Sequence, residues 1–414
     1  MNNILTNYIK NKLEITFVFI LYISLLIGFF FNENSTGGAY LDYLNQKKIS
    51  QDFAGNFYKT FFSFDKYSTR HSPVLIIFLS FFEKINLNDI FIRLVNLHIC
   101  LLLPILFWLV LKEKFKKIDS YKLLLVAGLV FLSPIFRSLS VWPDSRIYGL
   151  IIFLISIYYF LKFEDDKKIN NAIKCTFWCA ISAYFSPNFA LFAFFYFFKF
   201  FKYFLFKKEI FILAILNITL SLPAFIYIFL LESIFFFKSA IPGGNEDFKT
   251  VFNLSNKILI ISSIIFFYLI PFLITQTLKI NIKKLDLIIT SLIITTICIN
   301  YFNYKIEYTG GGIFYHLSNA LFGNNQLFYL LCLISLIYLL SIFLSNTDNL
   351  VIFIILILSN PQLTIYHKYY DPLIFILILT IYKLNLDIKK IIKNKNLTIF
   401  YIFNLSFLII NIIK

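Results

Sequence analysis

The sequence predicts an all-α membrane protein whose helices cross a lipid bilayer many times, and three observations lead to this fold class. Hydrophobic residues make up 59% of the 414 residues, the mean hydropathy is +0.78, and only 14% of the residues are charged. A soluble domain has too little interior to hide so much apolar surface. Several uninterrupted apolar runs also reach the roughly 18–20 residues that a helix needs to cross the hydrocarbon core, so we expect about 13 transmembrane helices.

The apolar runs alternate with short polar turns, and this alternation gives the expected order of the helices. We expect Leu13–Phe31 to leave the cytoplasm as an uncleaved anchor, because Lys10 and Lys12 precede it. Asn32–Asn88 is then a long outer loop, in which the apolar Pro73–Phe82 covers only about half a bilayer and predicts an interfacial or re-entrant helix. The other expected spans are Asp89–Leu111, Leu123–Leu139, Ile147–Leu161, Ala172–Phe185, Phe189–Phe204, Ile210–Leu231, Ile258–Thr277, Leu285–Tyr301, Leu327–Leu344, Leu350–Leu358, Leu373–Leu384 and Leu397–Ile413.

The formal net charge of +16 comes from lysines that cluster in short connections, such as KEKFKK at 112–117 and DIKKIIKNK at 387–395. The positive-inside rule places such turns in the cytoplasm, and we therefore expect a lipid bilayer and no nucleic acid as partner. The unusual polar turns then share the opposite face. They are Asn32–Asn88, SVWPDSR at 140–146, PGGNEDF at 242–248, the glycine triplet at 310–312 with His316, and YHKYYDP at 366–372. This arrangement predicts an active site at the outer membrane–water boundary.

No nucleotide or metal signature accompanies these turns. The five cysteines all lie within apolar runs, where small buried hydrophobic residues are expected. The sequence has no Walker motif, no GxGxxG and no HExxH, so ATP-driven or dinucleotide-driven chemistry is not indicated. We expect no cofactor; a divalent metal is compatible with the outer carboxylates, but no DxD pair indicates one.

Two stretches resemble the protein-O-mannosyltransferase and aminoarabinose-transferase-like branch of the GT-C membrane glycosyltransferases. The first contains the turn His71-Ser72-Pro73-Val74 and then Arg93-Leu94-Val95, where the family has His/Lys-Pro-Pro-Leu and Arg-Leu-Pro. The second is LSPIFRSLSVWPDSRIYGLIIFLISIYYFLK at 132–162. The resemblance covers roughly 13–205. It implies one membrane-embedded domain over 1–414, with a family-like catalytic half at 13–205 and a more variable half at 206–414.

The resemblance further implies a polyprenyl-phosphate-linked sugar as donor, an active site on the non-cytoplasmic face and an acidic base in the first outer loop. In this sequence two carboxylates fit that description. Glu33 directly follows the first span, whereas Asp42 lies in GGAYLDY after a glycine turn that lets backbone approach a ligand closely. We favour Asp42 and keep Glu33 as the alternative; Asp52 and Asp65 resemble ordinary surface acids.

A leaving phosphate needs cations that stabilise its developing charge. Arginine is scarce in this sequence beside lysine, and its planar guanidinium suits bidentate phosphate contacts. Snorkelling at the lipid interface and an interfacial aromatic belt are the simpler explanations for the same residues. The candidate phosphate-binding residues are Arg70, His71, Arg93, Arg146, His367 and Lys368, and the candidate substrate-binding residues are Tyr40, Trp142, Asp144 and Tyr369. Asp144 lies two residues before Arg146, and this spacing favours a role in orienting that arginine over a role in the chemistry.

The expected function is transfer of a sugar from the lipid donor to a hydroxyl of a glycan, lipid or protein acceptor. The expected location is the inner (plasma) membrane of a bacterium, with the site facing the periplasm or exterior. One alternative is a polymerase or ligase of the O-antigen type, which usually has its large loop later in the chain. The other is a flippase or transporter of lipid-linked sugars, which would need charges or broken helices at mid-membrane.

Overall fold

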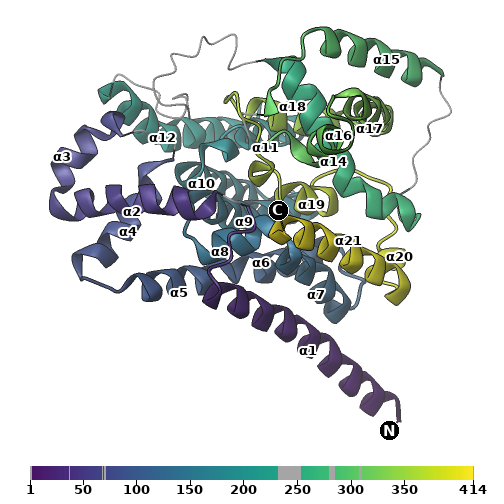
Figure 1. Ribbon diagram of the computed structural model, residues 1–414, viewed down its shortest axis with the longest axis horizontal. Coiled ribbons are helices and arrows are strands. Elements are labelled where there is room, and N and C mark those ends of the chain that lie inside the picture. The colour runs from purple at the N-terminus through teal and green to yellow at the C-terminus, as the bar shows by residue number, and fades with distance from the viewer. Residues whose placement is uncertain are drawn as a thin grey trace. The chain divides into compact units, whose positions relative to one another are not determined.

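The computed structural model describes residues 2–36, 38–67, 69, 71–231, 253–278, 285–306 and 310–413. Within these ranges the chain is built from helices without a β-strand, and an isolated antiparallel bridge joins Leu278 to Leu386 (Figure 1). The predicted all-α fold is confirmed. Arg70, Gly37 of the glycine turn and the PGGNEDF turn at 242–248 lie outside the described residues.

Seven of the described helices are long and apolar enough to cross a membrane, or eight if one bent pair forms a single span. That pair is Ser120–Leu132 with Pro134–Val141, which meet at an angle of 71° where a span over Leu123–Leu139 was expected. Other expected spans form shorter helices: α11 (Phe192–Phe204) has 13 residues and α19 (Leu373–Leu379) has 7. The total of about 13 spans therefore stays a prediction.

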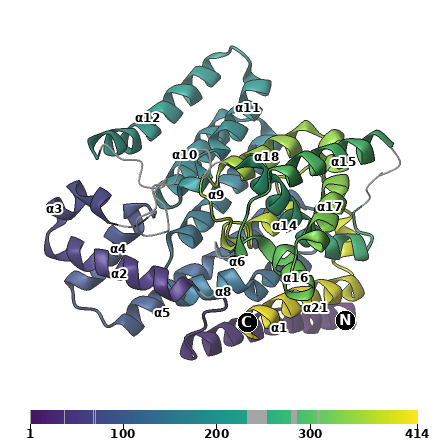
Figure 2. The ribbon, with the colours of Figure 1, turned by 45° about the horizontal axis from the view of Figure 1, so that its top comes forward.

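The chain divides into two compact units, and unit 1 comprises Met1–Ala240 and Leu397–Lys414. The long helices α9 and α10 form its central antiparallel hairpin (Figure 2). Near the chain ends, the Phe17 and Tyr401 rings lie 5.0 Å apart, and the Tyr401 hydroxyl donates to the Leu125 carbonyl at 2.7 Å. The helices of unit 1 are α1 (Asn2–Phe30), α2 (Ala39–Gly55), α3 (Phe57–Phe62), α4 (Pro73–Lys84), α5 (Asp89–Cys100), α6 (Leu102–Lys114), α7 (Ser120–Gly128), α8 (Pro134–Val141), α9 (Ser145–Asp166), α10 (Ile169–Phe185), α11, α12 (Lys208–Leu230) and most of α21 (Asn394–Ile413).

Unit 2 comprises Ile241–Asn396. Its helices are α14 (Leu254–Ile274), α15 (Leu285–Asn300), α16 (Gly312–Phe322), α17 (Gln326–Ser345), α18 (Thr347–Leu358), α19 and α20 (Ile388–Ile391). The apolar α14 packs against α15, α16 and α17 and is the more buried of the two candidate membrane spans that lie wholly within the described part of this unit.

The long first loop folds into helices of its own. Its α2 packs along α4, and the cluster between them contains Ile49, Phe53 and Ile76. Helix α4 starts where Pro73 occupies the first turn and Ser72 accepts from the Val74 amide, two features that favour a helix N-terminus. With 12 residues α4 is too short to cross a bilayer, as expected for Pro73–Phe82.

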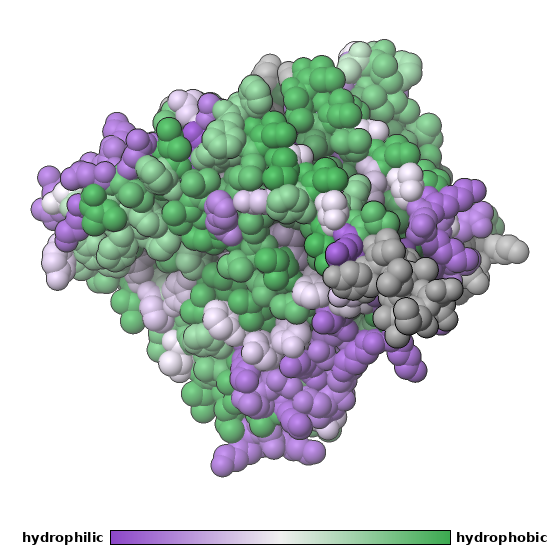
Figure 3. All heavy atoms as spheres, turned by 90° about the horizontal axis from the view of Figure 1, so that it is seen from below, coloured by the Kyte–Doolittle hydropathy of each residue, from purple (hydrophilic) through white to green (hydrophobic). Residues whose placement is uncertain are grey.

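The surface is largely apolar, as Figure 3 shows for the face in view. Large side chains such as Phe30, Phe206 and Phe229 are more than half exposed. Soluble monomers do not expose apolar surface on this scale, whereas lipid tails cover such a surface without a free-energy cost. The fold and surface therefore define an integral membrane protein of the helical class.

Candidate functional site

Unit 1 brings together three segments of the polar loops that the sequence analysis predicted to lie on the outer face. Asp42 lies in the first turn of α2, His71 lies just before α4, and Asp144 lies at the start of α9. One ligand atom from each of these residues lies within 4.8 Å of the other two. The structure thus gathers residues more than 100 positions apart in the chain into one polar cluster, which we call the outer cluster.

Asp144 fixes the position of Arg146. Its carboxylate caps α9 by accepting the Arg146 amide at 2.8 Å, and it also accepts from Nε of the same arginine at 2.8 Å and from Nη2. Asp144 is fully buried. A buried carboxylate needs such a partner, because an isolated charge in the interior is costly. Asp144 therefore orients Arg146, the role suggested by the spacing of the two residues.

Asp42 is the more open acid of the outer cluster. Its Oδ2 accepts from Nη2 of Arg146 at 2.9 Å, and 31% of its side chain is exposed. A guanidinium therefore lies between Asp42 and the buried Asp144. Asp42 therefore combines partial exposure with a cation directly beside its carboxylate.

His71 joins the outer cluster through α9. Its Nδ1 lies 3.0 Å from the Ser145 hydroxyl, next to Asp144 in the chain. The adjacent Ser72 hydroxyl donates to the Tyr184 carbonyl at the end of α10. These contacts tie the His71-Ser72-Pro73 turn to the central hairpin. The His71-Ser72-Pro73 turn could be recognised in the sequence, but the contact between His71 and Ser145 could not.

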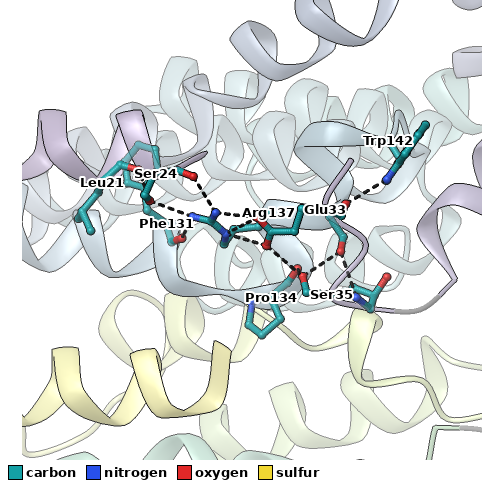
Figure 4. Close-up of polar contacts among 10 residues, drawn as sticks. Leu21, Ser24, Glu33, Ser35, Phe131, Pro134, Arg137 and Trp142 are labelled. Atoms are coloured by element: carbon teal, nitrogen blue, oxygen red, sulfur yellow. Dashed lines mark hydrogen bonds and ion pairs between the residues drawn. The ribbon is translucent and has the colours of Figure 1, made fainter. Parts of the chain in front are cut away.

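Glu33, the second candidate base, is engaged in a different interaction (Figure 4). Arg137 of α8 donates to it from Nε at 2.7 Å and from Nη2 at 2.6 Å, a two-pronged ion pair. Only 9% of the Glu33 side chain and 6% of the Arg137 side chain are exposed. Ser24 of α1 accepts from Arg137 through its hydroxyl at 3.0 Å and its carbonyl at 2.9 Å. Glu33 thus links the end of α1 to α8.

Trp142 connects the Glu33 ion pair to the outer cluster. Its indole N–H donates to the Glu33 carbonyl at 3.0 Å, and its ring lies 4.7 Å from the Tyr40 ring and 5.8 Å from the Tyr43 ring. Tyr40 and Tyr43 flank Asp42 on α2, so Trp142 holds the turn that carries this carboxylate. Trp142 is itself only 6% exposed, whereas Tyr40 is 41% exposed. Tyr40 is therefore the more accessible ring for a sugar.

Arg93 lies behind Trp142, with its guanidinium carbon 3.7 Å from the centre of the indole ring. Its Nε donates to the Val141 carbonyl at 3.2 Å, while Nη2 is buried without a hydrogen-bond partner. Among the arginines that the structure describes, Arg137 pairs with Glu33 and Arg146 with Asp144, whereas Arg93 forms no ion pair. Its guanidinium lies against the Trp142 and Phe29 rings, a cation–π arrangement, and the charge of Asp89 also acts on it.

Asp42, His71 and Asp144 are residue types that can ligate a metal. Arg146 already supplies positive charge to both carboxylates from between them, at 2.9 Å from Asp42. A divalent ion would have to compete with this guanidinium for the same oxygen atoms. We therefore assign no metal to the outer cluster.

The candidate phosphate-binding residues His367 and Lys368 and the candidate substrate-binding residue Tyr369 belong to unit 2. His367 Nε2 lies 3.0 Å from the Tyr268 hydroxyl. Burial, followed by the charge of His316, lowers the pKa of His367 to about 3, so its imidazole is neutral at pH 7. The Lys368 ammonium lies 4.8 Å from the Tyr366 ring centre, and the Tyr369 hydroxyl donates to Gln362 at 2.9 Å. Neutral His367 cannot act as the cation expected for phosphate binding.

No family model, no curated protein and no solved structure matches this chain. What the fold, the surface and the outer cluster define is an integral membrane protein of helical class with a polar site on loops of unit 1.

Proposed function

We propose that this protein is a membrane glycosyltransferase that moves a sugar from a polyprenyl-phosphate donor to an acceptor hydroxyl, with Asp42 as general base. The observation that carries the proposal is the partly exposed Asp42 carboxylate, held beside Arg146 and flanked by Tyr40, in the long loop after the first span. The proposal includes a GT-C-like arrangement of about 13 spans, and a site facing the periplasm or exterior of a bacterial inner membrane.

The environments of the two carboxylates favour Asp42 over Glu33. A general base must reach the acceptor hydroxyl within hydrogen-bond distance and must have a lone pair to accept its proton. Glu33 is nearly buried, and both of its oxygens accept from Arg137. Asp42 has the greater exposure and accepts from Arg146 through Oδ2. We therefore assign the base to Asp42 and a supporting structural role to Glu33.

The proposed reaction is a single displacement at the anomeric carbon. The acceptor oxygen forms a bond to this carbon while its proton passes to Asp42, and the bond from the carbon to the phosphate oxygen breaks. The polyprenyl phosphate leaves with the electron pair of that bond. Its developing negative charge needs fixed cations close by, because preorganised charges stabilise a transition state at little reorganisation cost.

Arg93 and Arg146 are the cations that we assign to the phosphate. Arg93 has a buried guanidinium without an ion-pair partner among the described residues. It lies against Trp142, which together with Tyr40 and Tyr43 forms an aromatic wall beside Asp42. Arg146 is oriented by Asp144 and already contacts Asp42. Tyr40 is the ring that we assign to stacking on the sugar, because it is the exposed member of the wall.

The test is the consumption of donor by the protein purified in nanodiscs. A panel of polyprenyl-phosphate sugars is incubated with the protein and simple acceptor glycosides, and the release of polyprenyl phosphate is measured. We expect one donor class to be consumed and its sugar to appear on the acceptor. If no donor is consumed but a fluorescent lipid-linked sugar crosses proteoliposome membranes, the transporter alternative replaces this proposal.

A further inference from the structure

The turn between α11 and α12 has features that the proposed reaction does not use. Residues 199–208 read KFFKYFLFKK, with four lysines, five aromatic residues and no acid. The turn joins the two helices at the top of Figure 2. It closes through two backbone hydrogen bonds, from Leu205 to Phe201 at 2.8 Å and from Lys207 to Phe204 at 3.1 Å.

Leu205 has a backbone conformation that is unfavourable for a leucine, with φ of 50° and ψ of −126°. The left-handed region suits glycine, and a bulky residue there is a genuine outlier. This conformation leaves Leu205 54% exposed and Phe206 80% exposed at the tip of the turn. Strained residues cluster at sites that make functional contacts, and here the strain presents an apolar side chain to the outside.

The lysines around this tip also project outward. Lys202, Lys207 and Lys208 are exposed, and the structure gives none of them an ion pair with a described carboxylate. The Lys202 ammonium lies 4.3 Å from the Phe198 ring centre. In the turn between α6 and α7, by contrast, Lys116 pairs with Glu113 at 2.9 Å and with Asp165 at 2.6 Å. The positive charge of the α11–α12 turn is therefore available to an external anion.

We propose that the α11–α12 turn is an interfacial anchor that binds anionic phospholipid headgroups. Leu205 and Phe206 insert at the boundary between headgroups and acyl chains, and Lys202, Lys207 and Lys208 contact the lipid phosphates. Apolar side chains flanked by lysines are the pattern of segments that lie in a membrane interface. Lysines close to an anionic lipid surface are attracted to it. The lipid contact compensates the strain at Leu205.

The test compares lipid retention by matched triple variants of the full chain. The protein is reconstituted with mixed phosphatidylcholine and phosphatidylglycerol, and the retained phosphatidylglycerol is counted by native mass spectrometry. Lys202→Gln/Lys207→Gln/Lys208→Gln removes the charges of the turn. Lys48→Gln/Lys59→Gln/Lys66→Gln removes an equal charge from exposed lysines of the first loop. We expect at least a twofold loss of phosphatidylglycerol in the first variant and none in the second; equal losses, or no loss in either, overturn the proposal.

A second variant separates lipid contact from general destabilisation. Leu205→Gly removes the apolar side chain and also relieves the left-handed strain. We expect its unfolding temperature in neutral detergent to rise, while the added stability that phosphatidylglycerol gives to the wild type is lost. If Leu205→Gly gains the same stability from phosphatidylglycerol as the wild type, the turn does not insert and the anchor is refuted. Both readouts are independent of sugar transfer.

Discussion

Gly28 of α1 lies directly against the ion pair between Glu33 and Arg137, and replacing it with alanine tests the importance of that pair. A methyl group on Gly28 would lie 2.1 Å from Oε2 of Glu33 and 2.9 Å from Nη2 of Arg137. Both distances are shorter than atoms tolerate, so the carboxylate must leave its present position. Gly28→Ala therefore separates the pair without removing either charge.

The expected magnitude follows from two opposing effects. Removing one partner of a buried ion pair destabilises a protein by about 3–5 kcal/mol; displacing the carboxylate approaches that upper limit here because Glu33 and Arg137 are both nearly buried. Alanine in place of glycine inside a helix gains about 1 kcal/mol. Gly28→Ala should thus lower the free energy of unfolding by about 2–4 kcal/mol, the opposite sign from helix propensity alone.

The assay is unfolding by SDS in mixed micelles, followed by circular dichroism. Gly55→Ala in α2 is the matched control, since a methyl group there meets no atom within 4 Å. It should leave the stability nearly unchanged or raise it slightly. If Gly28→Ala proves as stable as the wild type or more stable, the ion pair does not hold α1 against α8 and the reasoning about Glu33 fails.

Two further predictions concern unit 2. Gly310→Ala should destabilise the protein by about 1–3 kcal/mol, since Gly310 has φ of +74° and a methyl group would lie 2.5 Å from the Ile365 carbonyl oxygen. Gly323 is the matched control, because it has φ of +63° but open space around it. Gly323→Ala should cost about 1 kcal/mol in the same unfolding assay. The pKa of His367 is lowered from 6.5 to about 3, so its contribution to stability is complete above pH 6.5 and is lost towards pH 3, by up to about 1.4 kcal/mol per pH unit. His367→Gln should flatten that slope, and an unchanged slope would assign it to other groups.

Composition and hydropathy were sufficient to predict the fold class, because they report how much apolar surface the chain must hide. They also pointed to the first loop and to the short helix α4. The number of membrane spans was harder to predict from the sequence. Apolar runs such as Leu123–Leu139 look continuous in the sequence, but a break at Ser133-Pro134 bends the chain by 71°. Hydropathy does not register such a bend.

The candidate site was predictable only where its residues are close in the chain. The spacing of Asp144 and Arg146 suggested that the acid orients the arginine, and the structure places them in contact. The pairing of Glu33 with Arg137 joins residues 104 positions apart, as does that of Asp42 with Arg146, and no local pattern encodes such contacts. Trp142 was a candidate substrate-binding residue, and the structure shows it buried between Arg93 and the tyrosines of α2.

The central claim is that Asp42 is the base of a sugar transfer, and the most direct test measures turnover and stability on the same variants. Asp42→Asn should lower turnover of a consumed donor at least about 100-fold while leaving SDS unfolding unchanged. Asp65→Asn, in the same loop, should match the wild type in both assays, and Glu33→Gln should lose stability. If Asp42→Asn turns over donor as fast as the wild type, Asp42 is not the base.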